Sequence, residues 1–350
     1  KDFAEFVGVD YAVAVANGTV ALELALRALC IGEGDEVIVT PRTFLASASC
    51  IVAVGAVPIF VDVDKDSQNI TVETIRGAVS SRTRGIICVH LAGWPCDMDP
   101  IMDLAEKLGI YVIEDCAQAH GSVYKGRSVG SIGHIGAWSF CQDKIMTTGG
   151  EGGMVTTNDS SLWNTMWSYK DHGKSWQAVY EREHPAGFRW LHEGFGTNWR
   201  MTELQAVLGR IQITKMPDWH ACRLGNANRI WMHARQHLAL RVPEVPNTIV
   251  HAAYKCYLFV DREHLKPDWN RNRIMKEINA RGVPCYAGSC SEIYLEKAFE
   301  NKPSKPAKRL PIAKELGESS LMFQVHPTLL PEHIEKTCQV LSEVIELASE

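Results

Sequence analysis

The sequence predicts an α/β fold: a large domain with a mostly parallel sheet between helices, followed by a smaller α+β domain. Over the first 160 residues, short β-branched runs alternate with helical patterns, as is typical of a parallel sheet covered on both faces. This pattern changes from about Leu224. A length of 350 residues also suggests two domains. We therefore expect a large domain over residues 1–223 and a small domain over residues 224–350, with a soft boundary.

The strands of the large domain are expected where short runs are rich in β-branched residues. They cover residues 11–16, 36–40, 58–63, 85–90 and 110–114. Helices are expected at residues 18–29, 45–54 and 99–109. In the last of these helices, Asp99 can serve as N-cap, Pro100 suits the first position and Gly109 ends the helix.

The small domain is expected to combine short strands with two helices. The strands cover residues 254–260 and 283–286, and the helices cover residues 270–280 and 331–348. The last helix has apolar residues at helical spacing, which predicts one buried side. A further helix at residues 203–213 is expected to bridge the two domains.

Composition gives no support for several classes of partner. A net charge of -5 gives no reason to expect nucleic acid or an anionic membrane, which favour basic patches. No apolar run reaches the roughly 18 residues of a transmembrane helix. The 11 cysteines are scattered without zinc spacing, so we expect free thiols and a cytoplasmic location, and no metal. The chain begins at Lys1 rather than Met, and we expect an N-terminal segment to be missing.

Lys144 is the candidate for a reactive amine. Ligands of parallel α/β sheets bind beyond the carboxyl ends of the strands. Lys144 follows a probable strand end and precedes a glycine-rich turn at residues 149–153, where glycine allows close approach of backbone to a ligand. A desolvated lysine, or one near another cation, becomes a nucleophile toward carbonyl groups. The alternative is a surface lysine in a loop.

Asp115 is the candidate acid at the end of a buried strand. An acid in such a place can pair with the protonated pyridine nitrogen of a cofactor, which keeps the ring an electron sink. Asp115 could instead cap the following turn. Glu114 is a competing acid, but neighbouring side chains of a strand point to opposite faces, so only one of the two can face the site.

Phosphate and ring contacts are expected from three further segments. Backbone N–H groups at Gly18 and Thr19 begin a helix and make an anion site; a simple Asn17 or Thr19 helix cap explains these residues equally well. Ser139 is a second candidate for the phosphate. Phe44 could stack on an aromatic ring, and plain core packing is its alternative.

The order of these residues resembles the DegT/DnrJ/StrS sugar aminotransferases, a branch of the fold-type I pyridoxal-phosphate enzymes. Five segments carry the resemblance, at residues 16–22, 41–63, 114–121, 139–153 and 196–203. The resemblance covers nearly the whole chain. Members of this family usually have more sequence before the position of Lys1.

The resemblance implies a role for each site residue. Lys144 would bind pyridoxal 5'-phosphate as a Schiff base and shuttle a proton, and Asp115 would hold the pyridine nitrogen protonated. Gln118 would contact the phenolic oxygen and Phe44 would stack on the ring. The phosphate contacts would come from Gly18, Thr19, Ser139 and, from the neighbouring subunit of a homodimer, Asn198.

The same resemblance implies amination of a nucleotide-linked keto-sugar, with glutamate as amino donor. His172 and Tyr286 are candidate substrate contacts, although their segments match the family only loosely and a structural hydrogen bond explains His172 as well. Relatives that dehydrate carry His in place of the lysine, so Lys144 argues against that branch.

Three alternatives to a sugar aminotransferase differ in the substrate or in the class of protein. The first is an aminotransferase of the same family that acts on a cyclitol or aromatic precursor. The second is a regulatory relative without catalysis, which Lys144, Asp115 and Gln118 argue against. The third is a dinucleotide-binding dehydrogenase, but no G-x-G-x-x-G follows the first strand.

Overall fold

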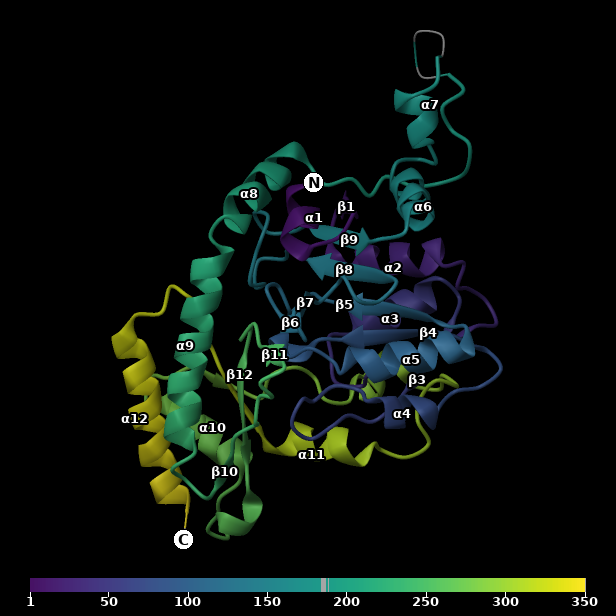
Figure 1. Cartoon of the computed structure of the whole chain (residues 1–350). Helices are drawn as coiled ribbons and strands as arrows, with labels where there is room; N and C mark the ends of the chain where they lie inside the picture. Colours follow the sequence, from purple (N-terminus) through teal and green to yellow (C-terminus); the bar gives the residue numbers. More distant parts are fainter. Residues whose placement is uncertain (184–186, 188, 350) are drawn as a thin grey trace.

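A seven-stranded sheet forms the centre of the computed structural model, which describes residues 1–183, 187 and 189–349 (Figure 1). Its order is β1-β9-β8-β5-β4-β2-β3. All strands run parallel except β9, which is antiparallel to both neighbours. The strands are β1 (Tyr11–Val15), β2 (Glu36–Val39), β3 (Val57–Phe60), β4 (Thr83–Val89), β5 (Tyr111–Asp115), β8 (Ile135–Ser139) and β9 (Gly153–Thr157). This confirms the mostly parallel sheet predicted from the sequence.

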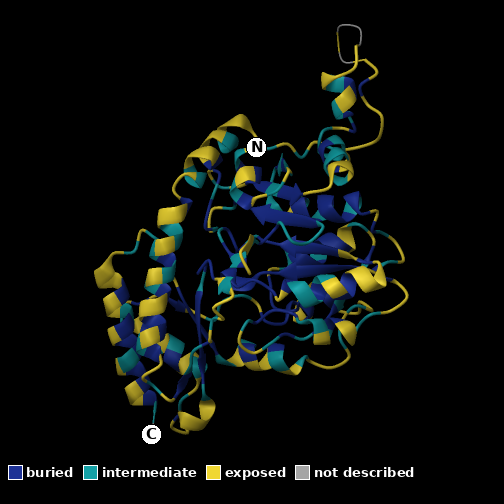
Figure 2. Cartoon of the chain, in the orientation of Figure 1, coloured by how far each residue is buried: buried dark blue, intermediate teal, exposed yellow. Residues whose placement is uncertain are grey.

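Helices cover both faces of this sheet, because alternate side chains of each buried strand point to opposite sides. In β4, Ile87 and Val89 join one core and Ile86 and Cys88 join the other. The first core includes α2 (Gly18–Ala28), α3 (Ala46–Ala53) and α6 (Ser160–Lys170). The second includes α4 (Val72–Arg76) and α5 (Met98–Leu108). Figure 2 shows the strands buried and the outer helix faces exposed.

A smaller antiparallel sheet follows in the C-terminal part of the chain. Its order is β10-β12-β14-β13, with bounds Leu240–Arg241, Cys256–Val260, Ser320–Phe323 and Cys285–Tyr286. One core joins this sheet to α9 (Met216–Ala234), α10 (Arg271–Ala280) and α12 (Pro331–Ala348). Helix α11 (Pro311–Ser319) lies between the two sheets, since Ala313 and Leu316 share a core with β4 and with Tyr257 of β12.

The remaining elements are short or peripheral. They are a small sheet of β11 (Ile249–Val250), β6 (Val123–Tyr124) and β7 (Arg127–Ser128), the helices α1 (Asp2–Val7), α7 (Trp176–Tyr180) and α8 (Glu203–Ile213), and the 3-10 turns η1 (Leu91–Gly93), η2 (Arg262–His264), η3 (Ile293–Leu295) and η4 (Lys297–Phe299). No helix among the described residues is long and apolar enough to cross a membrane. All 11 cysteines are free, and the cytoplasmic location stays a prediction.

The structure corrects one predicted helix start. Helix α5 begins at Met98 with Asp97 as the residue before it, so Asp99 is not the cap. Asp99 lies in the first turn instead, where its carboxylate accepts hydrogen bonds from Lys125 (2.7 Å) and Arg127, a position that also suits an acid at a helix N-terminus.

The two domains predicted from the sequence meet at residues 223 and 224, and both residues lie within the continuous helix α9. That helix was not predicted. The division into two domains at this point stays a prediction, whereas α8 and α12 have the bounds expected from the sequence.

Candidate active site

The predicted site residues gather at one edge of the large sheet. Because β1, β2, β4, β5 and β8 are parallel to one another, their carboxyl ends meet at the same edge. Asn17, Phe44, Asp115 and Ser139 all lie at or just beyond these ends. The topology therefore brings together residues that are up to 122 positions apart in sequence, from Asn17 to Ser139.

The start of α2 forms a cradle that suits a phosphate. The Asn17 side chain accepts a hydrogen bond from the Val20 N–H (3.0 Å) and caps the helix, while Gly18 and Thr19 occupy its first turn. A Cβ at Gly18 would lie only 2.6 Å from the Cβ of Ser139. The structure thus places Gly18 against Ser139, and the absence of a side chain keeps this helix N-terminus open to an anion.

Asp115 is buried at the end of β5, with 5% of its surface exposed. Its carboxylate accepts hydrogen bonds from the Ser47 hydroxyl (2.7 Å) and the Ala117 N–H (3.1 Å). Burial raises the pKa of Asp115, and these bonds and the charge of Lys144 act in the opposite direction. Asp115 therefore caps its turn, which was the alternative expected from the sequence. The charge of Lys144 also acts on its carboxylate.

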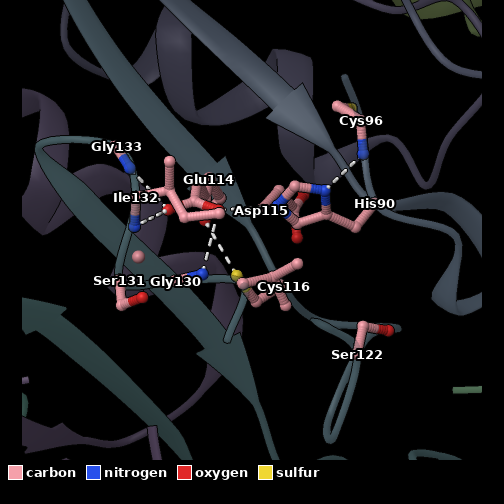
Figure 3. Close-up of polar contacts among 12 residues, drawn as sticks. His90, Cys96, Glu114, Asp115, Cys116, Ser122, Gly130, Ser131, Ile132 and Gly133 are labelled. Atoms are coloured by element: carbon pink, nitrogen blue, oxygen red, sulfur yellow. Dashed lines mark hydrogen bonds and ion pairs between the residues drawn. The ribbon is translucent and has the colours of Figure 1, made fainter. Parts of the chain in front are cut away.

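Glu114 is not a competing acid for this site, because other groups occupy both of its oxygens (Figure 3). His90 Nε2 lies 2.9 Å from Oε2. The Cys96 N–H donates to His90 Nδ1 (2.9 Å), so the ring proton is on Nε2 and donates to Glu114. The remaining bonds to Glu114 come from backbone N–H groups of one turn, at Gly130, Ile132 and Gly133.

Lys144 lies in the turn after β8 and is largely buried, with 16% of its side chain exposed. The ammonium group is 3.3 Å from the Asp143 carboxylate and 5.5 Å from the centre of the Tyr254 ring. The Tyr254 hydroxyl donates to the same carboxylate (2.6 Å). Such burial argues against a surface lysine and leaves an amine that is held by an acid and an aromatic ring.

Gln118 has one end of its side chain satisfied within the chain, and Phe44 is exposed. The side-chain oxygen of Gln118 accepts a hydrogen bond from the Ala92 N–H (2.9 Å), so its NH₂ group is the end available to donate. Phe44 is 71% exposed, which rules out core packing as its role within this chain. An exposed aromatic at the ligand edge of the sheet suits stacking on a flat ring.

The remaining predicted residues are Tyr286, His172 and Asn198. Tyr286 lines a pocket of about 280 Å³ together with Asp143 and Tyr254, the two residues that contact Lys144. His172 and Asn198 are exposed and lie on paired segments, where the His172 N–H donates to the Thr197 oxygen (2.9 Å). Neither of them lines this pocket, and their roles stay predictions.

Sequence reasoning missed Ser47, Asp143, Tyr254 and Arg223, the last of which also lines this pocket. Ser47 lies one turn after Phe44 in an apolar helix, and a small polar residue at that spacing is a signal that could have been noticed. The acid Asp143 adjoins the predicted lysine. Tyr254 and Arg223 lie far along the chain from Lys144, and no local pattern marks them.

The fold and this site together define a fold-type I enzyme architecture of the kind found in aminotransferases. The sequence pattern of the DegT/DnrJ/EryC1/StrS aminotransferase family matches residues 1–342. The chain belongs to this family and is an aminotransferase.

Relatives and solved structures agree with this assignment. GDP-perosamine synthase of Escherichia coli O157:H7 is 36% identical over 341 residues, which are 97% of this chain and 87% of the relative. A dTDP-3-amino-3,6-dideoxy-alpha-D-galactopyranose transaminase of Aneurinibacillus thermoaerophilus is 37% identical over 345 residues, or 98% and 88% of the two chains. An aminotransferase structure from Psychrobacter cryohalolentis superposes with a TM-score of 0.97 at 60% identity, and the match covers 99% of this chain and 90% of that one.

Proposed function

We propose that this aminotransferase uses pyridoxal 5'-phosphate to convert a nucleotide-linked keto-sugar into an amino-sugar, with glutamate as amino donor. One observation carries the proposal. The side chain of Lys144 is only 16% exposed and its charge acts on the buried acid Asp115, at the same sheet edge as an open helix N-terminus.

The residues fit the parts of pyridoxal phosphate one by one. The Gly18 cradle, which a Cβ would close, suits the phosphate together with Thr19 and Ser139. Asp115 suits the ring nitrogen, since a cationic partner would offset the cost of burying its charge. The donor end of Gln118 suits the phenolic oxygen and the exposed Phe44 suits the ring face. Lys144 would hold the aldehyde.

The bound cofactor would supply an electron sink for the bond broken at the substrate carbon. The protein's own side chains would move the proton and hold the reactive amine. The Lys144 amine would take the proton from the donor carbon and return it in the reverse half-reaction. Asp143 and Tyr254 would hold that amine in place through the ion pair and the ring contact already described.

The names of relatives support a nucleotide sugar as acceptor. One is a GDP-perosamine synthase and another a dTDP-amino-sugar transaminase, and at 36% and 37% identity they are about equally distant from this chain. The shared element of both names is an amino-sugar on a nucleotide, and we extend only this element to the present chain.

A homodimer with active sites at its interface forms part of the proposal. One side of α8 is exposed and apolar in the single chain, which is the usual property of a surface that another subunit covers. Its residues, with their exposed fractions, are Leu204 80%, Val207 53%, Leu208 43% and Ile211 50%. Such a helix face is costly to leave in water, and we assign it to the second subunit.

Visible absorption of the purified protein with added pyridoxal phosphate tests the proposal. We expect a band from the Lys144-bound cofactor that disappears when glutamate is added. Lys144→Ala should show no such band and no turnover, whereas the exposed Lys107→Ala should behave like the wild type. Near wild-type turnover in Lys144→Ala would contradict the assignment, and a band that ignores glutamate would exclude glutamate as donor.

A further inference from the structure

Arg223 is a buried cation for which the described part of the chain provides no anion. It lies in α9 with 6% of its surface exposed, and its Nε atom is buried without a hydrogen-bond partner. Burial lowers the pKa of the guanidinium to about 10, so it remains charged at neutral pH. A buried charge without a partner is strongly unfavourable, and its presence indicates that an anion binds here.

A pocket of about 280 Å³ lies directly at this guanidinium. Two cations, Arg223 and Lys255, line it against the single acid Asp143. His326 also lines it, and burial lowers the pKa of this histidine. Lys255 lies 5.2 Å from the Tyr254 ring centre and donates to Ser289 (3.4 Å). The pocket therefore combines a cationic lining with a place for a ligand between the large and the small sheet.

Asp143 does not serve as the missing anion of Arg223. Its carboxylate forms the ion pair with Lys144 and accepts the hydrogen bond of Tyr254, and no ion pair joins it to Arg223 in the described residues. Asp143 lies next to Lys144 in sequence and also lines the pocket. Because the Asp143 carboxylate lies 3.3 Å from the Lys144 ammonium, the acid that lines this pocket also contacts the reactive amine.

We propose that Arg223 anchors an oxyanion of a substrate, a carboxylate or a phosphate, in the pocket beside Lys144. This inference rests on the proposed function and names a specificity residue for it. The planar guanidinium fork matches both carboxylate and phosphate oxygens. Two sources share this chemistry, namely the carboxylates of the amino donor and the diphosphate of the nucleotide sugar.

Calorimetric titration of the cofactor-loaded enzyme with two probes tests the anchor and separates its sources. Glutarate represents the carboxylates of the donor and inorganic pyrophosphate represents the diphosphate. Charge-assisted hydrogen bonds of this kind account for about 10- to 100-fold in affinity. We expect at least one probe to bind the wild type and to bind Arg223→Met weaker by that factor.

Arg229→Met is the matched control, because Arg229 is an exposed arginine of the same helix. It should bind both probes as the wild type does. Equal affinity of wild type and Arg223→Met for both probes would overturn the anchor, and so would a wild type that binds neither probe.

A structure of the wild-type enzyme with the bound probe keeps the test decisive if Arg223→Met does not fold. The probe should then lie within hydrogen-bond distance of the Arg223 guanidinium, and a probe bound elsewhere would refute the inference. Because calorimetry measures anion binding and the visible spectrum measures cofactor and donor chemistry, the anchor and the proposed function can fail independently.

Discussion

Glu114 and Asp115 are neighbours on β5, yet their carboxylates have opposite environments and opposite pKa shifts. Burial raises the pKa of both groups, but the hydrogen bond from His90, with those from backbone N–H groups, brings that of Glu114 below its ordinary value of 4.5. Asp115 has fewer such partners and its pKa is raised. The strand therefore keeps one acid fully satisfied inside the protein and leaves the other in need of a cationic partner at the site.

The decrease in the free energy of unfolding at acidic pH should depend on Glu114. Its folded-state pKa lies below the unfolded value, so it stabilises the fold above pH 4.5, and this contribution is lost as the pH falls through the folded-state pKa. Glu114→Gln places an NH₂ group against backbone donors and should cost about 1–3 kcal/mol at neutral pH. Chemical denaturation from pH 3 to 7 measures both effects, and an unchanged acid slope in the variant would contradict this account.

At the scale of elements, the sequence predicts best what depends on local periodicity. Helix α12 is amphipathic and begins at Pro331, so its bounds were predictable. Helix α9 mixes polar residues with a buried Arg223 and was missed, because contacts with the small sheet rather than its own pattern determine its buried side. Likewise, Lys144 and Asp115 follow strand ends in sequence, whereas Tyr254 reaches Lys144 only through the folded chain.

The contact between the start of α2 and the end of β8 should tolerate no side chain at Gly18. In Gly18→Ala the new Cβ would lie 2.6 Å from Ser139, so the two elements must separate. We expect a stability loss of about 1–3 kcal/mol and weaker cofactor binding by roughly tenfold or more, because the N–H groups of the cradle move. Cofactor titration and denaturation measure the two effects.

Gly225→Ala is the matched control for that substitution. Gly225 lies within α9, and a Cβ there would contact nothing within 4 Å. Alanine should stabilise this helix by about 0.5–1 kcal/mol without changing cofactor affinity. If Gly18→Ala bound the cofactor as tightly as Gly225→Ala, the cradle would not be the phosphate site.

At the scale of the whole molecule, hydrogen bonds join the large sheet to the small sheet and to α11. Arg42, which follows β2, donates to the Ser320 hydroxyl of β14 (2.7 Å). The Asp62 carboxylate accepts hydrogen bonds from the Ile312 (2.9 Å) and Ala313 (2.8 Å) N–H groups at the start of α11, where a negative charge is favourable. The large sheet, the small sheet and α11 are thus joined within one chain, whereas we propose that the exposed face of α8 contacts a second subunit.

Mixed dimers can show whether the second subunit completes each site. Lys144→Ala and Asn198→Ala should each have low activity when pure. If Asn198 acts across the interface, a mixed dimer of the two variants contains one site with both wild-type residues and one with neither. A random equal mixture has about half mixed dimers, and should recover about a quarter of wild-type activity.

Recovery should be absent when Lys144→Ala is mixed with the double variant. If Asn198 acts within its own chain, no mixed dimer has a complete site, and the mixture should show no more than the mean of its components.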